Sequence, residues 1–135
     1  MRYVLDTTAF SAVMRRDSAL LTLIKGYKPN DIVTVPPVIA EIHYGIKRLK
    51  NASKKALLLK AERDRLLSII NVLPWQSEAS NKYGEIKANI ERRCKIIYDF
   101  DIAIAAIAIS HGCGVLTANL KHFERIKDLE TRCWL

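Results

Sequence analysis

The chain has 135 residues, of which half are hydrophobic, and its mean hydropathy is +0.01. Twenty-two Lys and Arg against 14 Asp and Glu give a net charge of +8. These values exclude a disordered or membrane-embedded chain and predict one domain with its own core. The positive charge favours a polyanionic partner, most often a nucleic acid. The first strand leads directly to Asp6 without a signal peptide, and three scattered cysteines favour a reducing compartment, so we expect a cytoplasmic protein.

Expected strands and helices alternate along the chain. We expect strands at residues 2–5, 31–35, 71–75, 115–117 and 131–134. Helices are expected after residue 8 and at 19–25, 36–49, 53–70, 77–94, 99–112 and 120–126. Such alternation predicts an α/β domain, a central, mostly parallel sheet of four to five strands with helices on both faces. The helical hairpin 36–70 is the most separable part of this single domain, residues 1–135.

The stretch 99–112, DFDIAIAAIAISHG, is the most distinctive in the chain. It is apolar all round, which predicts a buried helix, and it is too short to span a bilayer. Two acids stand at its start, where free backbone N–H groups stabilise negative charge. One acid suffices as an N-cap. We expect Asp99 to take that place, which leaves Asp101 for another role.

Four polar residues are expected at one edge of the sheet. Asp6 and Asn119 follow strands, Asp101 starts the core helix, and Glu41 lies early in the helix after the second strand. Each has a structural alternative, since Asp6 can cap a helix and Asn119 can serve a turn. Glu41 has no basic partner at helical spacing, which favours a functional role. Converging carboxylates repel unless a cation joins them, and oxygen ligands favour Mg²⁺ or Mn²⁺.

Hydroxyl and imidazole side chains are less informative. Thr7, Thr8 and Thr117 lie beside the acids, where their hydroxyls could orient a ligand or water, although threonine is also common in turns and strands. The histidines are scattered along the chain, and we assign none of them a catalytic role: His43, His111 and His122.

The sequence resembles the PIN-domain ribonucleases, and within them most closely the toxins of the VapC type. The resemblance rests on Leu5-Asp6-Thr7, on Glu41 within VIAEIHYGI, on DIAIAAIA from Asp101, and on LTANLKHFERI from Leu116. It covers essentially the whole chain and implies a three-layer α/β/α sandwich. It also implies that Asp6, Glu41 and Asp101 bind the metal, and that Thr7, Thr117 and Asn119 complete the active site.

Three positions depart from the family pattern. Thr8 stands where Asn or Ser is usual, and Cys94 where a glycine often ends the preceding helix. Asn119 stands where many relatives have Asp, which would weaken a second metal site. No core acid is lost, so we expect an active enzyme.

The expected activity is endoribonuclease cleavage, in which one or two Mg²⁺ or Mn²⁺ ions activate water and leave a 5′-phosphate and a 3′-hydroxyl. Structured RNA, such as a tRNA or rRNA loop, is the expected substrate, and five basic residues are candidates to hold its backbone: Arg15, Arg16, Lys47, Arg48 and Lys121. Asp99 either caps its helix or reaches the metal through water.

The resemblance also implies a homodimer and a small VapB-like antitoxin that holds the enzyme inactive. Apolar residues of the 52–70 helix exceed one stripe, and we expect a partner chain to cover some of them, a packed hairpin being the alternative: Leu57, Leu58, Leu59, Leu66 and Leu67. Two other functions are alternatives to this enzyme. A non-catalytic RNA-binding module would be favoured by loss of an acid, and a phospho-accepting signalling domain by an acidic pair after the first strand.

Overall fold

A five-stranded sheet, parallel throughout, forms the centre of the computed structural model, which describes residues 1–135. The strand order is β3-β2-β1-β4-β5. The strands are β1 (Tyr3–Leu5), β2 (Ile32–Thr34), β3 (Asn71–Val72), β4 (Gly114–Leu116) and β5 (Thr131–Arg132). The expectation of a mostly parallel sheet of four to five strands is confirmed.

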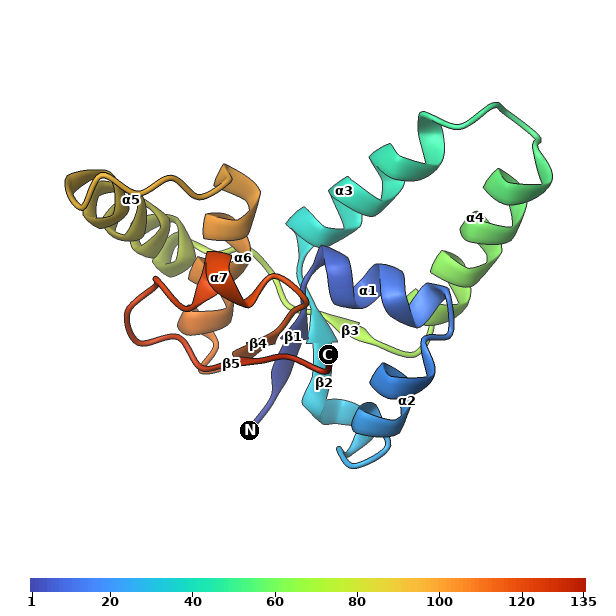
Figure 1. Cartoon of the computed structure of the whole chain (residues 1–135), viewed down its shortest axis with the longest axis horizontal. Coiled ribbons are helices and arrows are strands. Elements are labelled where there is room, and N and C mark those ends of the chain that lie inside the picture. Colours follow the sequence, from blue (N-terminus) through green and yellow to red (C-terminus); the bar gives the residue numbers. More distant parts are fainter.

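Helices cover the sheet and extend from it as two arms. They are α1 (Thr7–Met14), α2 (Ser18–Ile24), α3 (Pro36–Lys47), α4 (Lys54–Leu67), α5 (Ser77–Arg92), α6 (Asp99–Ser110) and α7 (Leu120–Phe123), with a 3₁₀ turn at Pro29–Asp31. In Figure 1, α5, α6 and α7 lie on one side, and α1, α2 and the α3–α4 hairpin lie on the other. The hairpin projects as one arm and α5 forms the other. No helix has the length and apolar character needed to cross a membrane.

The central strand β1 determines where polar residues gather. Its register pairs Val4 with Val33 of β2 and Leu5 with Leu116 of β4. Because all three strands are parallel and in step, the residues that follow them emerge at the same edge of the sheet. Asp6 and Thr117 are therefore neighbours although 111 residues separate them in the sequence.

Helix α6 is the buried helix that its composition predicts. Every side chain from Ile102 to Ala108 is buried. The predicted cap at its start is wrong, however. Tyr98 occupies the N-cap position without a side-chain hydrogen bond, and Asp99 is the first helical residue. Once helical, Asp99 points to the neighbouring helix, where Lys87 offers a 3.0 Å ion pair.

Helix α5 also begins and ends slightly differently from the expectation. Gln76, not Ser77, is its N-cap. Beyond its end, Cys94 has φ = 54°, and the N–H of Lys95 donates to the carbonyl of Ile90. This left-handed turn is the helix ending that glycine favours. This geometry explains why the family described above often has a glycine where this chain has Cys94.

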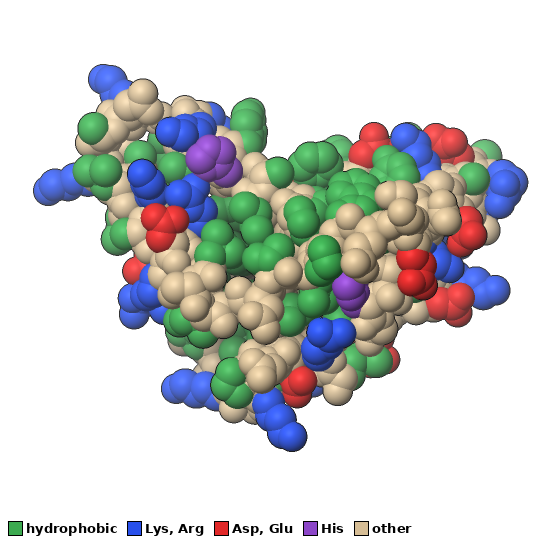
Figure 2. All heavy atoms as spheres, turned by 180° about the vertical axis from the view of Figure 1, so that it is seen from behind, with side chains coloured by type: hydrophobic (Ala, Val, Ile, Leu, Met, Phe, Trp, Pro, Cys, Tyr) green, Lys and Arg blue, Asp and Glu red, His purple; other side chains and the backbone are tan.

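The α3–α4 hairpin packs only part of its apolar surface. Leu66 is buried, Leu59 and Leu67 are half-buried, and Leu57 and Leu58 are 58% and 62% exposed. The packed hairpin therefore accounts for some of the apolar excess and leaves two leucines for another surface. Figure 2, which shows the side opposite to Figure 1, places many Lys and Arg side chains over the hairpin arm.

Candidate functional site

Asp6 is the buried centre of the candidate site. It follows β1, is only 1% exposed, and caps α1 by accepting a 2.9 Å hydrogen bond from the N–H of Ala9. The hydroxyls of Thr8 and Thr117 donate to its two carboxylate oxygens over 2.7 and 2.6 Å. Burial raises the pKa of Asp6 against the opposite effect of these hydrogen bonds, and the nearby charge of Asp101 raises it further. Asp6 is thus both a cap and a perturbed acid.

The hydroxyls of Thr8 and Thr117 connect Asp6 to the loop after β4 through hydrogen bonds. Thr117, which is fully buried, accepts a 2.8 Å hydrogen bond from the N–H of Asn119. The Thr8 hydroxyl accepts a 2.9 Å bond from the N–H of Ala118. The unusual Thr8 therefore joins the first helix to the last part of the site. Asn119 is exposed, and its side chain makes no capping bond to α7.

Glu41 enters the site from the second turn of α3. The Thr7 hydroxyl donates to Glu41 Oε1 over 2.5 Å. No basic side chain pairs with Glu41, as its helical spacing predicts. Glu41 lines a surface depression of about 270 Å³, together with Thr7, Arg48 and Lys55. Lys55 was not among the sequence-based candidates, because nothing in the sequence places α4 beside Glu41.

Asp101 lies in the first turn of α6, half-buried and close enough to Asp6 to affect its pKa. Its Oδ2 atom is 2.9 Å from Nδ1 of His122, which lies on α7. This contact was missed in the sequence, where the two residues are 21 positions apart and the histidines appear scattered. The one available signal was that His122 follows Asn119 by three residues and so belongs to the same turn.

Asp99 lies apart from these acids. Its carboxylate is 61% exposed and is bound to Lys87, whose hydrogen bond is the main cause of a lowered Asp99 pKa, ahead of Tyr83. A water-mediated contact between Asp99 and a metal stays a prediction.

The donor chemistry fits a hard divalent cation. Glu41 Oε2 and Asp101 Oδ1 accept no hydrogen bond, and Asp6 and Asp101 combine two negative charges that a cation would neutralise. As the side chains stand, no three His, Cys, Asp or Glu residues enclose a metal position. Glu41 accepts its hydrogen bond from Thr7.

The basic candidates differ in availability. Arg16 pairs with Glu62 over 3.1 Å, and Arg15 donates to the hydroxyl of Ser11. Lys47, Arg48 and Lys121 are exposed and form no ion pair. Arg15 lines a second depression, of about 430 Å³, which includes Thr7 and Thr8.

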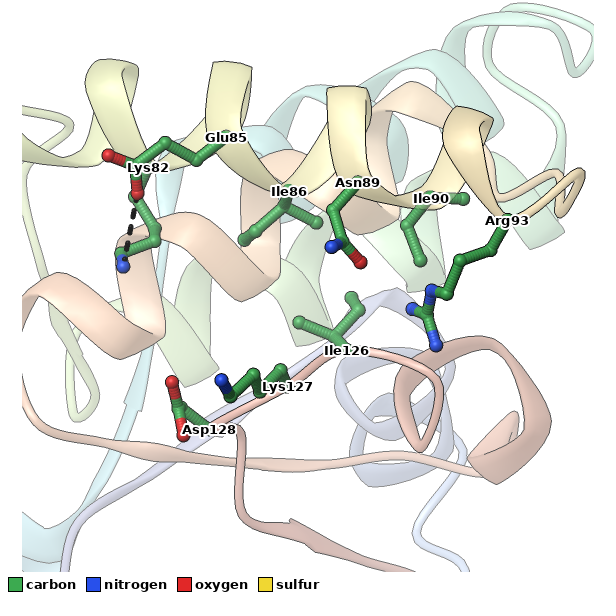
Figure 3. A pocket seen from close by; sticks show the side chains of 9 residues that line it. All are labelled: Lys82, Glu85, Ile86, Asn89, Ile90, Arg93, Ile126, Lys127 and Asp128. Atoms are coloured by element: carbon green, nitrogen blue, oxygen red, sulfur yellow. Dashed lines mark ion pairs between the residues drawn. The ribbon is translucent and has the colours of Figure 1, made fainter.

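A separate pocket of about 150 Å³ lies between α5 and the segment before β5 (Figure 3). Its charges are mixed, and Lys82 is paired with Glu85 over 3.2 Å. None of the candidate site residues lines it.

The comparison with known families identifies the domain. The PIN domain matches residues 3–129, which include all the candidate site residues. The chain belongs to the PIN-domain family. The predicted family and fold are therefore confirmed.

The relatives of this PIN domain include ribonucleases of similar length. Ribonuclease VapC2 of Rickettsia felis is 30% identical, and the match covers 99% of this chain and 98% of that protein. Ribonuclease VapC2 of Haemophilus influenzae is 28% identical, with coverage of 100% and 99%.

Solved structures lead to the same group. VapBC2 from Rickettsia felis, bound to a DNA fragment from its promoter, superposes with a TM-score of 0.88 at 25% identity and full coverage of both chains. VapBC-1 from nontypeable Haemophilus influenzae gives 0.84 at 26% identity, covering 99% of this chain and 98% of that one.

Proposed function

We propose that this PIN domain is the toxin of a toxin–antitoxin pair, an endoribonuclease that requires Mg²⁺ or Mn²⁺ and cleaves structured RNA. The observation that carries the proposal is the buried carboxylate of Asp6 beside Asp101 at the carboxyl edge of the sheet. The full-length similarity to ribonucleases named VapC supports it. A relative from Shigella flexneri, 23% identical, is named as a tRNA(fMet)-specific endonuclease, which makes tRNA the first substrate to test.

Asp6 and Asp101 would hold the cation, with Glu41 as the third carboxylate. A divalent cation supplies an activated water and stabilises charge on the leaving oxygen. The chain itself fixes the geometry: Thr117 and Thr8 hold both oxygens of Asp6, so that the carboxylate cannot rotate. Burial also excludes bulk water from Asp6, which strengthens its attraction for a cation.

Basic residues around the carboxylates would bind the RNA backbone. Arg48 and Lys55 lie in the depression that Glu41 borders, and Arg15 lies in the one that Thr8 borders. The two depressions share Thr7 and Ser11. A strand of RNA crossing the first turn of α1 would therefore meet positive charge on both sides of the acids.

A VapB-like antitoxin is the proposed partner. The solved relatives are described as VapBC assemblies, and one is bound to promoter DNA. An arginine of such a partner could pair with the carboxylates of the site, because a guanidinium binds a carboxylate through two hydrogen bonds. Exposed Leu57 and Leu58 offer apolar surface for a second chain, either the antitoxin or another copy of this one. Light scattering of the purified chain tests the homodimer, and a monomer at micromolar concentration would exclude it.

Cleavage of end-labelled tRNA tests the activity. Purified parent protein is incubated with a tRNA pool in Mg²⁺ or Mn²⁺, beside Asp6→Asn and Asp101→Asn variants. We expect discrete fragments from the parent alone, abolished by EDTA, and a loss of at least about a hundredfold in the variants because the cation is no longer held. The matched control is Asp64→Asn, because Asp64 is exposed and pairs with its neighbour Arg63.

Each other outcome has a definite meaning. Equal cleavage by parent and variants would show a contaminating nuclease and contradict the proposal. Tight RNA binding without cleavage of tRNA or rRNA by the parent would favour the non-catalytic RNA-binding module instead. Cleavage that persists in EDTA would contradict the metal requirement but leave the ribonuclease assignment intact.

A further inference from the structure

His122 lies next to the candidate carboxylates, in contact with Asp101, but is not itself one of the candidate metal ligands. Its Nδ1 atom is 2.9 Å from Asp101 Oδ2, within range of a strong hydrogen bond. An ionised carboxylate only accepts hydrogen bonds, so the imidazole must carry the proton on Nδ1 and donate it. The bond therefore occupies one oxygen of Asp101 and leaves Oδ1 free on the other side.

The ring of His122 is held from two directions. Tyr98, the residue before α6, packs edge-on against it at a centroid distance of 5.8 Å. The helix that carries it, α7, is anchored by Phe123, which is fully buried next to it in the sequence. The N–H of His122 also donates to the carbonyl of Asn119 over 3.0 Å. A surface histidine without a role would be free to turn, whereas this one is fixed towards Asp101.

We propose that His122 is a positioning residue that orients the Asp101 carboxylate, so that Oδ1 faces the divalent cation beside Asp6. This inference rests on the proposed metal-dependent function and adds a residue to it. Carboxylates that bind metals are commonly held by hydrogen bonds of this kind, and loss of the outer partner typically lowers metal affinity or activity by about 10- to 100-fold.

The position of His122 gives this bond a second consequence. Asp101 is attached to the sheet only through α6, whereas Asn119 and Thr117 come from the loop after β4. The bond from α7 to α6 therefore connects the two halves of the site, as Thr8 connects α1 to the loop at Ala118. Without it, the orientation of Asp101 depends on its own rotamer alone.

Two substitutions separate the hydrogen bond from the packing. His122→Phe keeps an aromatic ring against Tyr98 but cannot donate. His122→Asn loses the ring but retains an amide N–H close to the position of Nδ1. The matched control is His43→Phe, because His43 is exposed on the hairpin arm, where its ring contacts Arg63.

Mn²⁺ affinity is the primary measurement, by electron paramagnetic resonance of free Mn²⁺, and tRNA cleavage is the second. Thermal unfolding confirms that each variant is folded. We expect His122→Phe to bind Mn²⁺ at least about tenfold more weakly than the parent, with a similar loss of cleavage. His122→Asn should recover most of both, and His43→Phe should match the parent.

Three results would overturn the inference. Parent-like Mn²⁺ affinity in folded His122→Phe would show that the bond does not position the ligand. Equal weakening in His122→Asn and His122→Phe would assign the effect to packing of the ring. If the parent itself binds no Mn²⁺ and cleaves no RNA, the proposed function fails and the role of His122 fails with it. The first two results, in contrast, contradict only the role of His122 and leave the proposed function intact.

Discussion

At the scale of single residues, the site depends on Asp6, whose charged form is destabilised by burial in the folded protein. Asp6 is buried, and three hydrogen bonds only partly offset the desolvation of its charge. A charged group that destabilises the free protein is stabilised when a cation binds, so stability and metal binding are linked through this one carboxylate.

The raised pKa of Asp6 predicts the direction of a pH effect. In the unfolded chain the Asp6 carboxyl has a pKa near the ordinary 3.8, and in the folded protein its pKa is higher. The folded state therefore binds the proton of Asp6 more tightly. The free energy of unfolding falls as the pH rises from about 3.8 through the raised pKa of the folded state. Asp6→Asn removes the titration and keeps a good N-cap. In EDTA at neutral pH we expect the variant to melt at a higher temperature than the parent, with a difference that shrinks towards pH 4.

Asp17→Asn is the matched control for this experiment. Asp17 caps α2 through a 3.0 Å bond from the N–H of Leu20, but its side chain is only half-buried. Its substitution makes the same Asp-to-Asn change at an N-cap that is not deeply buried, so it should not raise the melting temperature at neutral pH as Asp6→Asn does. A lower melting temperature for Asp6→Asn than for the parent at pH 7 would contradict the desolvation argument. Addition of Mn²⁺ should stabilise the parent more than Asp6→Asn.

At the scale of elements, the site is held in place by close contact between strands. Gly114 opens β4, and a Cβ atom there would lie 2.7 Å from the ring of Tyr3 on β1 and 3.1 Å from the carbonyl oxygen of Glu130. The Tyr3 ring is itself buried and packs edge-on against Tyr27. Neither the ring nor the backbone of Glu130, which leads into β5, can withdraw easily, so the close approach of these segments requires a glycine.

Gly114→Ala is therefore expected to destabilise the fold by about 1–3 kcal/mol, as overpacking typically does. Gly84→Ala is the control of opposite sign. Gly84 is exposed within α5 and has no atom within 4 Å of an added Cβ, so alanine should stabilise by up to about 1 kcal/mol. Urea unfolding of both variants measures the difference. Equal stability of the two variants would contradict the packing argument.

At the scale of the whole molecule, the net charge is +8, but only some of the basic side chains are free to bind a phosphate. Arg16, Lys82 and Lys87 are committed to ion pairs, whereas Arg48 and Lys121 are exposed and unpaired near the carboxylates. A cation without a carboxylate partner can bind a phosphate and release its counterions, which makes binding depend on salt.

RNA binding should therefore weaken steeply with salt, and specific cations should account for the slope. We expect Arg48→Gln or Lys121→Gln to weaken tRNA binding and to reduce the slope of log K against log salt by about 1 each. Lys25→Gln is the control, because Lys25 is the C-cap of α2 and precedes the start of β2, whereas the candidate site follows the strand ends. Filter binding in EDTA between low and moderate salt measures the slopes. An unchanged slope in Arg48→Gln would exclude a phosphate contact there.

The sequence was sufficient for the strands, the buried helix and the PIN-domain family, because each strand, helix and motif is a local pattern that can be read without knowing which segments touch. The apolar run of α6 is of this kind, and so is the strand–acid junction at Asp6. The errors and omissions involve contacts between segments. Asp99 was expected to cap its own helix, but Lys87 on α5 lies within reach of its carboxylate. The bond of His122 to Asp101 depends on where a four-residue helix packs, which no local pattern encodes.

The parallel register has a consequence for the order of synthesis. The central strand β1 is made first, yet one of its two neighbours, β4, begins at Gly114, in the last fifth of the chain. Thr117, which holds one oxygen of Asp6, is made later still. A growing chain therefore carries Asp6, Glu41 and Asp101 before it can hold them in place, because non-local strand pairing must follow synthesis of both strands. Such a nascent chain lacks an assembled site until the loop that carries Thr117 has emerged from the ribosome.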